Sequence, residues 1–337
     1  MPRLFFILGR GRSGTTWLAR TLTQHPRIAV APEGLFVLDL FDRYAPRPLS
    51  PEARTRFCAD LRRERRMHGW HLQPQRVAAR LHALPEPVRY AQACAAVYES
   101  YAADTLGRSG LTWIGDKNPL HALFGARLAQ LFPDARFVHL SRDHRDNVRS
   151  FRSAAFDLGH PGALAYRWRR YNQEILSLAE RAPGRVLSLR FEDVLQRPQH
   201  ELARICAFLE LEPHPAMLDA RRSGPRLRPG ARPGWFEQPP DALAGVREQA
   251  GAPELPAAMI DTADAIAGPI AERLGYARTS RSGSRDRRAP APMFSTALGW
   301  LYGWSSVQAE KLLFSACPAE LRMALINAYR RAPGRNP

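Results

Sequence analysis

The sequence is short of lysine, of paired cysteines and of long apolar runs. Lys117 and Lys311 are its only lysines, so arginine supplies nearly all of the positive charge behind the net charge of +17. Four cysteines are present, none in a C-x-x-C pair and none near a histidine at metal-site spacing, which argues against the common zinc and redox motifs. We therefore expect reduced cysteines and a reducing compartment.

No apolar stretch approaches the roughly 20 residues that cross a bilayer. The first apolar run, residues 4–8, is also too short for the core of a signal peptide. We expect a soluble cytoplasmic protein, large enough for one α/β domain with an appendage. Its net positive charge favours binding to a polyanion, whether a phosphorylated donor, an acidic acceptor, nucleic acid or an anionic membrane surface.

Short apolar segments alternate with helical patterns, which predicts an α/β fold with a parallel sheet and right-handed crossovers. The expected strands are residues 4–8, 28–31, 112–115, 136–140 and 185–190. The expected helices of this core are residues 15–23, 120–132, 163–182 and 198–209, and Glu192-Asp193 is expected to open a loop. Residues 35–107 contain no convincing strand and predict a helical insertion over the active site. Its expected helices start at residue 36 and span 51–66 and 88–106, with the basic run at 62–66 on a solvated helix face.

The end of the chain differs in composition from the rest. We expect a domain over residues 1–277, a flexible linker over 278–292 and an amphipathic helical tail over 293–337, which includes a further helix over 318–331. Trp300, Trp304, Val307 and Phe314 fall near one helical stripe of the tail. Such a stripe would pack on the domain, join two copies of the chain, or lie in a membrane interface.

The first strand leads into a glycine-rich loop, RLFFILGRGRSGTTW over residues 3–17. Strand, loop and helix in this order place backbone N–H groups and a helix N-terminus around a phosphate. Gly9 and Gly14 have the G-x-x-x-x-G spacing of a P-loop, which requires a lysine next. Here Thr15 and Thr16 follow, and the cation is Arg12, which suits a single 5′-phosphoryl-type group better than a triphosphate.

Two further motifs follow predicted strands. Arg142 follows RFVHLS, and Ser150 lies eight residues later near the start of a helix. An Arg and a Ser in this position offer a planar donor fork and a neutral donor to a phosphate, although Arg142 could instead pair with Asp143 or Asp146. The third motif is VLSLRFEDVL, followed by a helix that closes on ICAFLELE.

Together these motifs resemble those of the sulfotransferases that use 3′-phosphoadenosine 5′-phosphosulfate (PAPS), over residues 3–212. The resemblance implies that the first loop binds the 5′-phosphosulfate and that Arg142 and Ser150 bind the 3′-phosphate. A late basic loop also contacts the 3′-phosphate in this family, and Arg226 and Arg228 are candidates here. The implied loop residues are Gly11, Arg12, Ser13, Gly14, Thr15, Thr16 and Trp17.

The chain looks closer to the tyrosylprotein and bacterial sulfotransferases than to the cytosolic small-molecule enzymes. It lacks the loop lysine and the Lys-Thr-His base of the latter, and Glu33 lies 21 residues after Arg12, where the former branch has its base. Lys117 in GDKNP matches the catalytic lysine of that branch. Glu33 could instead be a first-turn helix carboxylate, and Lys117 could pair with Asp116.

These residues predict transfer of a sulfuryl group from PAPS to an acceptor hydroxyl or amine by in-line displacement, with no metal. Glu33 would be the base, with His121 the next candidate, and Arg12 and Lys117 would be the cations. The acceptor, whether small molecule, glycan, lipid or peptide, has no signature. A small-molecule kinase, a basic nucleic-acid-binding protein and an inactive family member are the alternatives; we expect no nucleic-acid partner.

Overall fold

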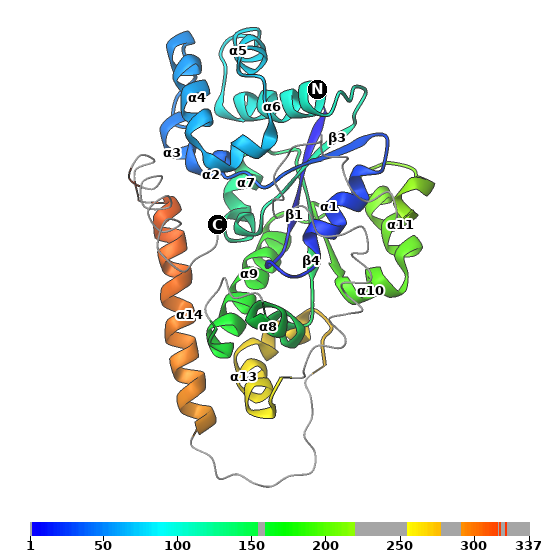
Figure 1. Cartoon of the computed structure of the whole chain (residues 1–337), viewed down its shortest axis with the longest axis vertical. Coiled ribbons are helices and arrows are strands. Elements are labelled where there is room, and N and C mark those ends of the chain that lie inside the picture. Colours follow the sequence, from blue (N-terminus) through cyan, green and yellow to red (C-terminus); the bar gives the residue numbers. More distant parts are fainter. Residues whose placement is uncertain are drawn as a thin grey trace.

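The computed structural model describes residues 2–153, 159–219, 255–277, 291–315, 317 and 321 (Figure 1). Five strands form one parallel sheet in the order β2-β3-β1-β4-β5. The strands are β1 (Arg3–Leu8), β2 (Ile28–Ala31), β3 (Trp113–Lys117), β4 (Arg136–Ser141) and β5 (Val186–Arg190). The predicted α/β fold class is confirmed, and each predicted strand end lies within two residues of the observed one.

The register of the sheet aligns the ends of the central strands. Ile7 on β1 pairs with Lys117 on β3, and Leu8 pairs with His139 on β4. Because the strands are parallel, their carboxyl ends lie at one edge, where an open α/β sheet binds its ligands. The loop after β1, Lys117 and the loop after β4 therefore meet at that edge.

Helices cover both faces of the sheet (Figure 1). One face is covered by α1 (Thr15–Thr23), α10 (Phe191–Gln196), α11 (Pro198–Phe208) and the 3-10 helix η4 (Pro215–Leu218). The other is covered by η3 (Pro119–Phe124), α7 (Gly125–Leu131) and α9 (Pro161–Arg181), with α8 (His144–Ser153), α13 (Ala257–Arg273) and α14 (Ala291–Ser315) packed against α9. The segment that opens with Glu192 and Asp193, expected to be a loop, is the helix α10.

The helical insertion consists of short pieces rather than the few longer helices expected. Its elements are α2 (Phe36–Asp39), α3 (Phe41–Tyr44), α4 (Pro51–Arg63), η1 (Arg65–Trp70), α5 (Pro74–His82), α6 (Tyr90–Ser100) and a π-helical turn, η2 (Tyr101–Thr105). The helix expected to continue to residue 66 ends at Arg63, because Glu64 adopts an extended conformation and caps η1 by accepting a hydrogen bond from Arg66 N.

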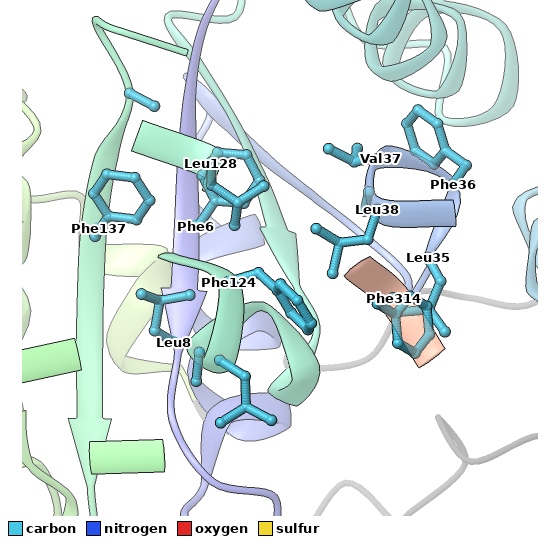
Figure 2. Close-up of a cluster of buried hydrophobic side chains, with 14 of the residues drawn as sticks. Phe6, Leu8, Leu35, Phe36, Val37, Leu38, Phe124, Leu128, Phe137 and Phe314 are labelled. Carbon is cyan, nitrogen blue, oxygen red and sulfur yellow. The ribbon is translucent and has the colours of Figure 1, made fainter. Parts of the chain in front are cut away.

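Aromatic and aliphatic side chains from distant parts of the chain share one core (Figure 2). Phe6 of β1 stacks on Phe137 of β4, with ring centroids 5.7 Å apart. Phe314, near the end of α14, contacts Phe124 of η3 with ring centroids 5.9 Å apart. The C-terminal helix is therefore anchored in the same core as the sheet.

Several expectations for the end of the chain lie outside the described residues. These are Arg226 and Arg228, residues 278–290 of the linker, and a helix expected at residues 318–331. The helix α14 begins at Ala291, two residues before the expected start of the tail. Of the helices in the described part, none has both the length and the apolarity to cross a bilayer.

Candidate active site

The loop between β1 and α1 is shaped by two glycines. Gly14 has φ 86°, a left-handed conformation, and a Cβ there would lie 2.3 Å from the ring of Phe191. A Cβ on Gly9 would lie 2.4 Å from the carbonyl oxygen of Leu140. In this described segment no side chain caps α1, and its first turn has no acidic residue, so the N-terminus of α1 at the sheet edge is suited to bind an anion.

The loop cation and the second predicted motif lie together. Arg12, at φ 65°, donates from Nε to Ser150 Oγ over 3.0 Å. Arg142 donates from Nη1 to the carbonyl oxygen of Arg12 over 3.4 Å. Burial, and secondarily the charge of Arg142, lowers the pKa of Arg12. The two positive charges repel each other, so an anion between them would be stabilised.

Asn147, which we did not predict, connects the same two loops. Its fully buried amide donates to Gly11 O over 2.9 Å and to Ser13 Oγ over 3.2 Å. The contact fixes the loop over residues 9–14, which we call the phosphate loop, to α8, the helix that carries Ser150. In the sequence, the only sign of this role is an asparagine one turn into the helix that follows Arg142. An asparagine at such a position does not by itself indicate a contact.

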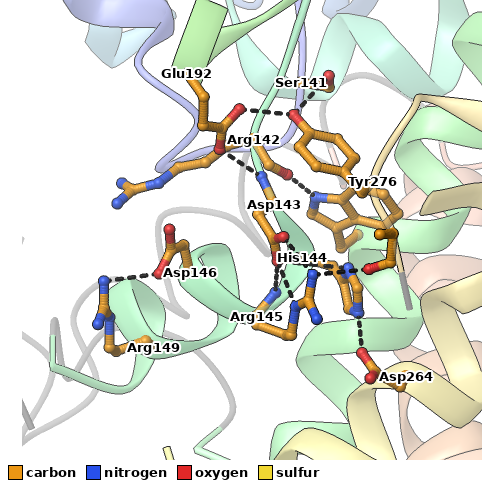
Figure 3. A network of polar contacts seen from close by, with 12 residues as sticks. Ser141, Arg142, Asp143, His144, Arg145, Asp146, Arg149, Glu192, Asp264 and Tyr276 are labelled. Carbon is orange, nitrogen blue, oxygen red and sulfur yellow. Dashed lines mark hydrogen bonds and ion pairs between the residues drawn. The ribbon is translucent and has the colours of Figure 1, made fainter. Parts of the chain in front are cut away.

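A polar network holds the segment around Arg142 (Figure 3). Asp143 N donates to Glu192 Oε1 over 2.9 Å, and Tyr276 donates to Glu192 Oε2 over 2.9 Å. Trp168 Nε1 donates to the carbonyl oxygen of Arg142 over 2.9 Å. The main chain on both sides of Arg142 is therefore fixed by β5–α10 and α9.

The acidic residues near Arg142 have other partners. Arg145 pairs with Asp143 at 2.7 Å, and Arg149 pairs with Asp146 at 2.7 Å. The side chain of Arg142 extends away from Asp143 (Figure 3), and its guanidinium lies 5.6 Å from the ring centroid of Phe191. Both acidic neighbours of Arg142 are thus paired with another arginine, and a role of Arg142 in ligand binding stays a prediction.

Glu33 and Lys117 meet at the end of β3. Lys117 Nζ lies 2.5 Å from Glu33 Oε1 and donates to Thr16 Oγ1 over 3.0 Å. The Lys117 side chain is 3% exposed, whereas that of Glu33 is 31% exposed. Glu33 precedes α2 rather than lying in its first turn. A carboxylate that solvent reaches, a buried ammonium group and the phosphate loop are thus within contact distance.

A second cation reaches Glu33 from the insertion. Arg66 Nη1 lies 3.5 Å from Glu33 Oε2, so at least one arginine of the basic run belongs to the site rather than to a solvated helix face. In the same turn, Met67 and Trp70 pack against Gly34, where a Cβ would lie 3.0 Å from the Trp70 ring. The insertion therefore forms the wall next to the carboxylate.

Asp116 belongs to a buried cluster behind the site rather than to an ion pair with Lys117, from which it points away along the strand. It is 1% exposed and accepts a hydrogen bond from Tyr98 OH. Burial raises the pKa of Asp116 to about 8. His121 is fully buried with Nδ1 3.9 Å from Asp116 Oδ1, and burial lowers its pKa to about 3. His121 is therefore not placed to take a proton from an acceptor.

The two other histidines near the second motif have structural contacts. His139 Nε2 lies 2.9 Å from Asn172 Oδ1, and burial lowers its pKa to about 4. His144 Nε2 lies 2.6 Å from Asp264 Oδ1. In the part of the chain that the structure describes, no three His, Cys, Asp or Glu side chains are grouped to hold a metal ion.

Comparison with known proteins gives the family. A family model described as "Sulfotransferase family" matches residues 2–215. The chain belongs to the sulfotransferase family. The match contains the phosphate loop, Glu33, Lys117 and the Arg142–Ser150 segment.

Curated relatives and solved structures agree with this family. Two proteins named "Putative protein-tyrosine sulfotransferase", from Caenorhabditis briggsae and Caenorhabditis elegans, are 26% and 27% identical over 31% and 28% of this chain. Each alignment spans 39% of the relative's length.

The sulfotransferase domain of the Synechococcus PCC 7002 olefin synthase superposes with a TM-score of 0.55 at 23% identity, covering 82% of this chain and 96% of that domain. The sulfotransferase domain from the curacin biosynthetic pathway superposes with a TM-score of 0.52 at 19% identity, covering 82% of this chain and 99% of that domain. At such identities these superpositions support the shared fold, and the roles of individual residues stay predictions.

Proposed function

We propose that this sulfotransferase transfers a sulfuryl group from PAPS to an acceptor hydroxyl or amine, with Glu33 as the general base. The observation that supports this most directly is the position of Lys117 Nζ, 2.5 Å from Glu33 and 3.0 Å from Thr16 of the phosphate loop. A base for the acceptor and a cation for the leaving side are thus adjacent at the ligand edge of the sheet.

The side chains around the loop fit a donor with two separated anionic groups. Thr15, Thr16 and the open N-terminus of α1 offer hydroxyl and N–H donors for a 5′-phosphosulfate. Arg142 and Ser150 would hold the 3′-phosphate, and Ser150 already accepts a hydrogen bond from Arg12. Arg226 and Arg228 remain candidate contacts to the same phosphate.

The chemistry follows from these positions. PAPS supplies the sulfuryl group and is released as 3′-phosphoadenosine 5′-phosphate (PAP). Glu33 accepts the proton of the acceptor hydroxyl while the acceptor oxygen bonds to sulfur and the bond from sulfur to the phosphate oxygen breaks. Arg12 and Lys117 stabilise the negative charge that develops on the leaving side. Lys117 can exchange its contact with Glu33 for a donor oxygen while keeping its bond to Thr16.

Calorimetric titration of the full chain with PAP and with ATP tests the donor assignment. We expect PAP to bind much more tightly, because the loop lacks the lysine that a triphosphate requires. Arg142→Ala should weaken the binding of PAP by about 1.5–3 kcal/mol, the cost of losing a charged hydrogen bond. The binding of an analogue without the 3′-phosphate should change little.

Arg273→Ala is the matched control, since this exposed arginine pairs with exposed Glu180 at the end of α9. Equal affinity for PAP and ATP, or tighter binding of ATP, would refute the donor assignment and favour the kinase alternative. An equal loss in the Arg273 variant would show that the Arg142 effect is non-specific.

The acceptor is a separate question. The nematode relatives are named as protein-tyrosine sulfotransferases, which makes a tyrosine-containing peptide one class to test beside phenols, glycans and lipid headgroups. Incubation with radiolabelled PAPS and each class, with products identified by mass spectrometry, would identify the acceptor. A labelled product that depends on Glu33 supports the proposal; labelled product of equal yield with Glu33→Gln contradicts it.

A further inference from the structure

The C-terminal helix α14 packs against α9 through small residues. A Cβ on Gly299 would lie 2.6 Å from Gly162 Cα, and a Cβ on Gly303 would lie 2.5 Å from Tyr166 Cβ. Val307 and Phe314 continue the same face and are buried. The two helices therefore approach closely along a fixed contact line, and the opposite face of α14 points away from the domain (Figure 1).

The charged side chains of α14 pair with residues of α9. Glu310 and Lys311 are the only charged residues between positions 291 and 315. Glu310 pairs with Arg167 and accepts a hydrogen bond from Tyr171 OH over 3.1 Å. Lys311 Nζ lies 2.5 Å from Glu174 Oε1 of α9. Neither charge is therefore available to make the outer face of α14 polar.

The outer face is largely apolar, although Ser305 and Gln308 are also exposed. Across the described residues, six of the eight large apolar side chains that are substantially exposed belong to this one helix, with 43–64% of each exposed. They are Leu298, Trp300, Leu301, Tyr302, Trp304 and Leu312. A soluble domain does not normally leave so much contiguous apolar surface in water without a binding function.

We propose that this face of α14 binds the surface of an anionic lipid bilayer, with the helix lying parallel to the membrane. Tryptophan and tyrosine beside leucine are the side chains that settle at headgroup depth. The net charge of +17 attracts the chain to anionic lipid and disfavours its approach to a second copy. The inference is independent of the proposed chemistry, and a chain held at a membrane would encounter lipid-linked or membrane-displayed acceptors there.

The exposed area also favours a membrane over a second copy. Six side chains, each about half exposed, present roughly 500–600 Å². A standard protein interface buries about 800 Å² on each partner. A single convex helix with no outward charge in its described side chains lacks the polar rim that such interfaces have.

Sedimentation with vesicles tests the proposal on the full chain. Vesicles of phosphatidylglycerol and phosphatidylcholine in equal parts, at low salt, should carry the wild type into the pellet, and vesicles of phosphatidylcholine alone should carry less. The double variant Leu301→Asp, Leu312→Asp should partition at least about 10-fold less, because it removes the two most exposed apolar side chains of the face.

Leu218→Asp is the matched control, since Leu218 is 46% exposed but lies in η4, packed beside α1 and α11 away from α14. It should pellet like the wild type, and all variants should retain wild-type circular dichroism and PAP binding. Pelleting of the double variant equal to that of the wild type would overturn the proposal. So would a wild type that stays in the supernatant, or a stable dimer in analytical ultracentrifugation that the double variant abolishes.

Discussion

The buried carboxyl of Asp116 should make the stability of this protein depend on pH near neutrality. Burial raises the pKa of Asp116 to about 8, with the charge of Glu33 adding to the rise and Tyr98 and Lys117 opposing it. In the unfolded chain the same carboxyl titrates near pH 4. Between these values the native state holds a proton that the unfolded state has lost, so the free energy of unfolding falls as the pH rises.

The neighbouring His121 limits the range in which this effect is visible. Its pKa is lowered to about 3, so below about pH 6.5 the unfolded chain takes up a proton that the native state does not. The two slopes have opposite signs and largely cancel between pH 4 and 6.5. Above this range the Asp116 slope acts alone, at about 1.4 kcal/mol per pH unit. From pH 6.5 to 8 the loss should be about 2 kcal/mol.

Comparison of the wild type with Asp116→Asn by urea unfolding at pH 6.5 and 8 isolates this contribution. The free energy of unfolding of the variant minus that of the wild type should be about 2 kcal/mol larger at pH 8 than at pH 6.5. Asp143→Asn is the control, because the partners of Asp143 lower its pKa and it is ionised in both states over this range. A wild-type-to-Asn difference that stays constant between the two pH values would show that Asp116 is ionised in the native protein.

Two further substitutions test the site and its loop. Glu33→Gln should retain PAP binding and lower kcat by roughly 10²–10⁴-fold in steady-state assays, and near-normal turnover would place the base elsewhere. Gly14→Ala should lower the stability by about 1–3 kcal/mol in thermal unfolding, because φ is 86° and Phe191 occupies the space of a Cβ. It should also weaken the binding of PAP. Gly69→Ala, with open space at its Cβ, should unfold near the wild-type temperature, and equal losses in both glycine variants would contradict this account.

The sheet and the proximity of the two motif loops could be predicted because each depends on local patterns. Strands buried on both faces produce continuous apolar runs, and these runs placed β1 and β4 within two residues of their observed ends. Since β1 and β4 are neighbours in a parallel sheet, the residues that follow them must lie side by side. The contact between Arg12 and Ser150 is a consequence of that topology.

The partners of individual polar residues could not be predicted in this way. Arg66 belongs to a run of arginines that looks like a solvated helix face, and only the break at Glu64 turns its side chain toward Glu33. Asp116 appeared able to pair with Lys117, its neighbour in sequence. On a strand, however, successive side chains point to opposite faces, which directs Asp116 to Tyr98 in the insertion.

The two sides of the site therefore come from different kinds of sequence. The proposed donor side consists of loops at the ends of β1 and β4, whose geometry is set by the sheet and fixed by the hydrogen bonds of Asn147 to Gly11 and Ser13. The side next to Glu33 is built by the insertion, through the ion pair with Arg66 and the packing of Trp70 on Gly34. Changes within the insertion can alter what reaches the carboxylate without moving the phosphate loop. Acceptor choice should accordingly be determined by the insertion, and this is why the donor motifs in the sequence carry no information about the acceptor.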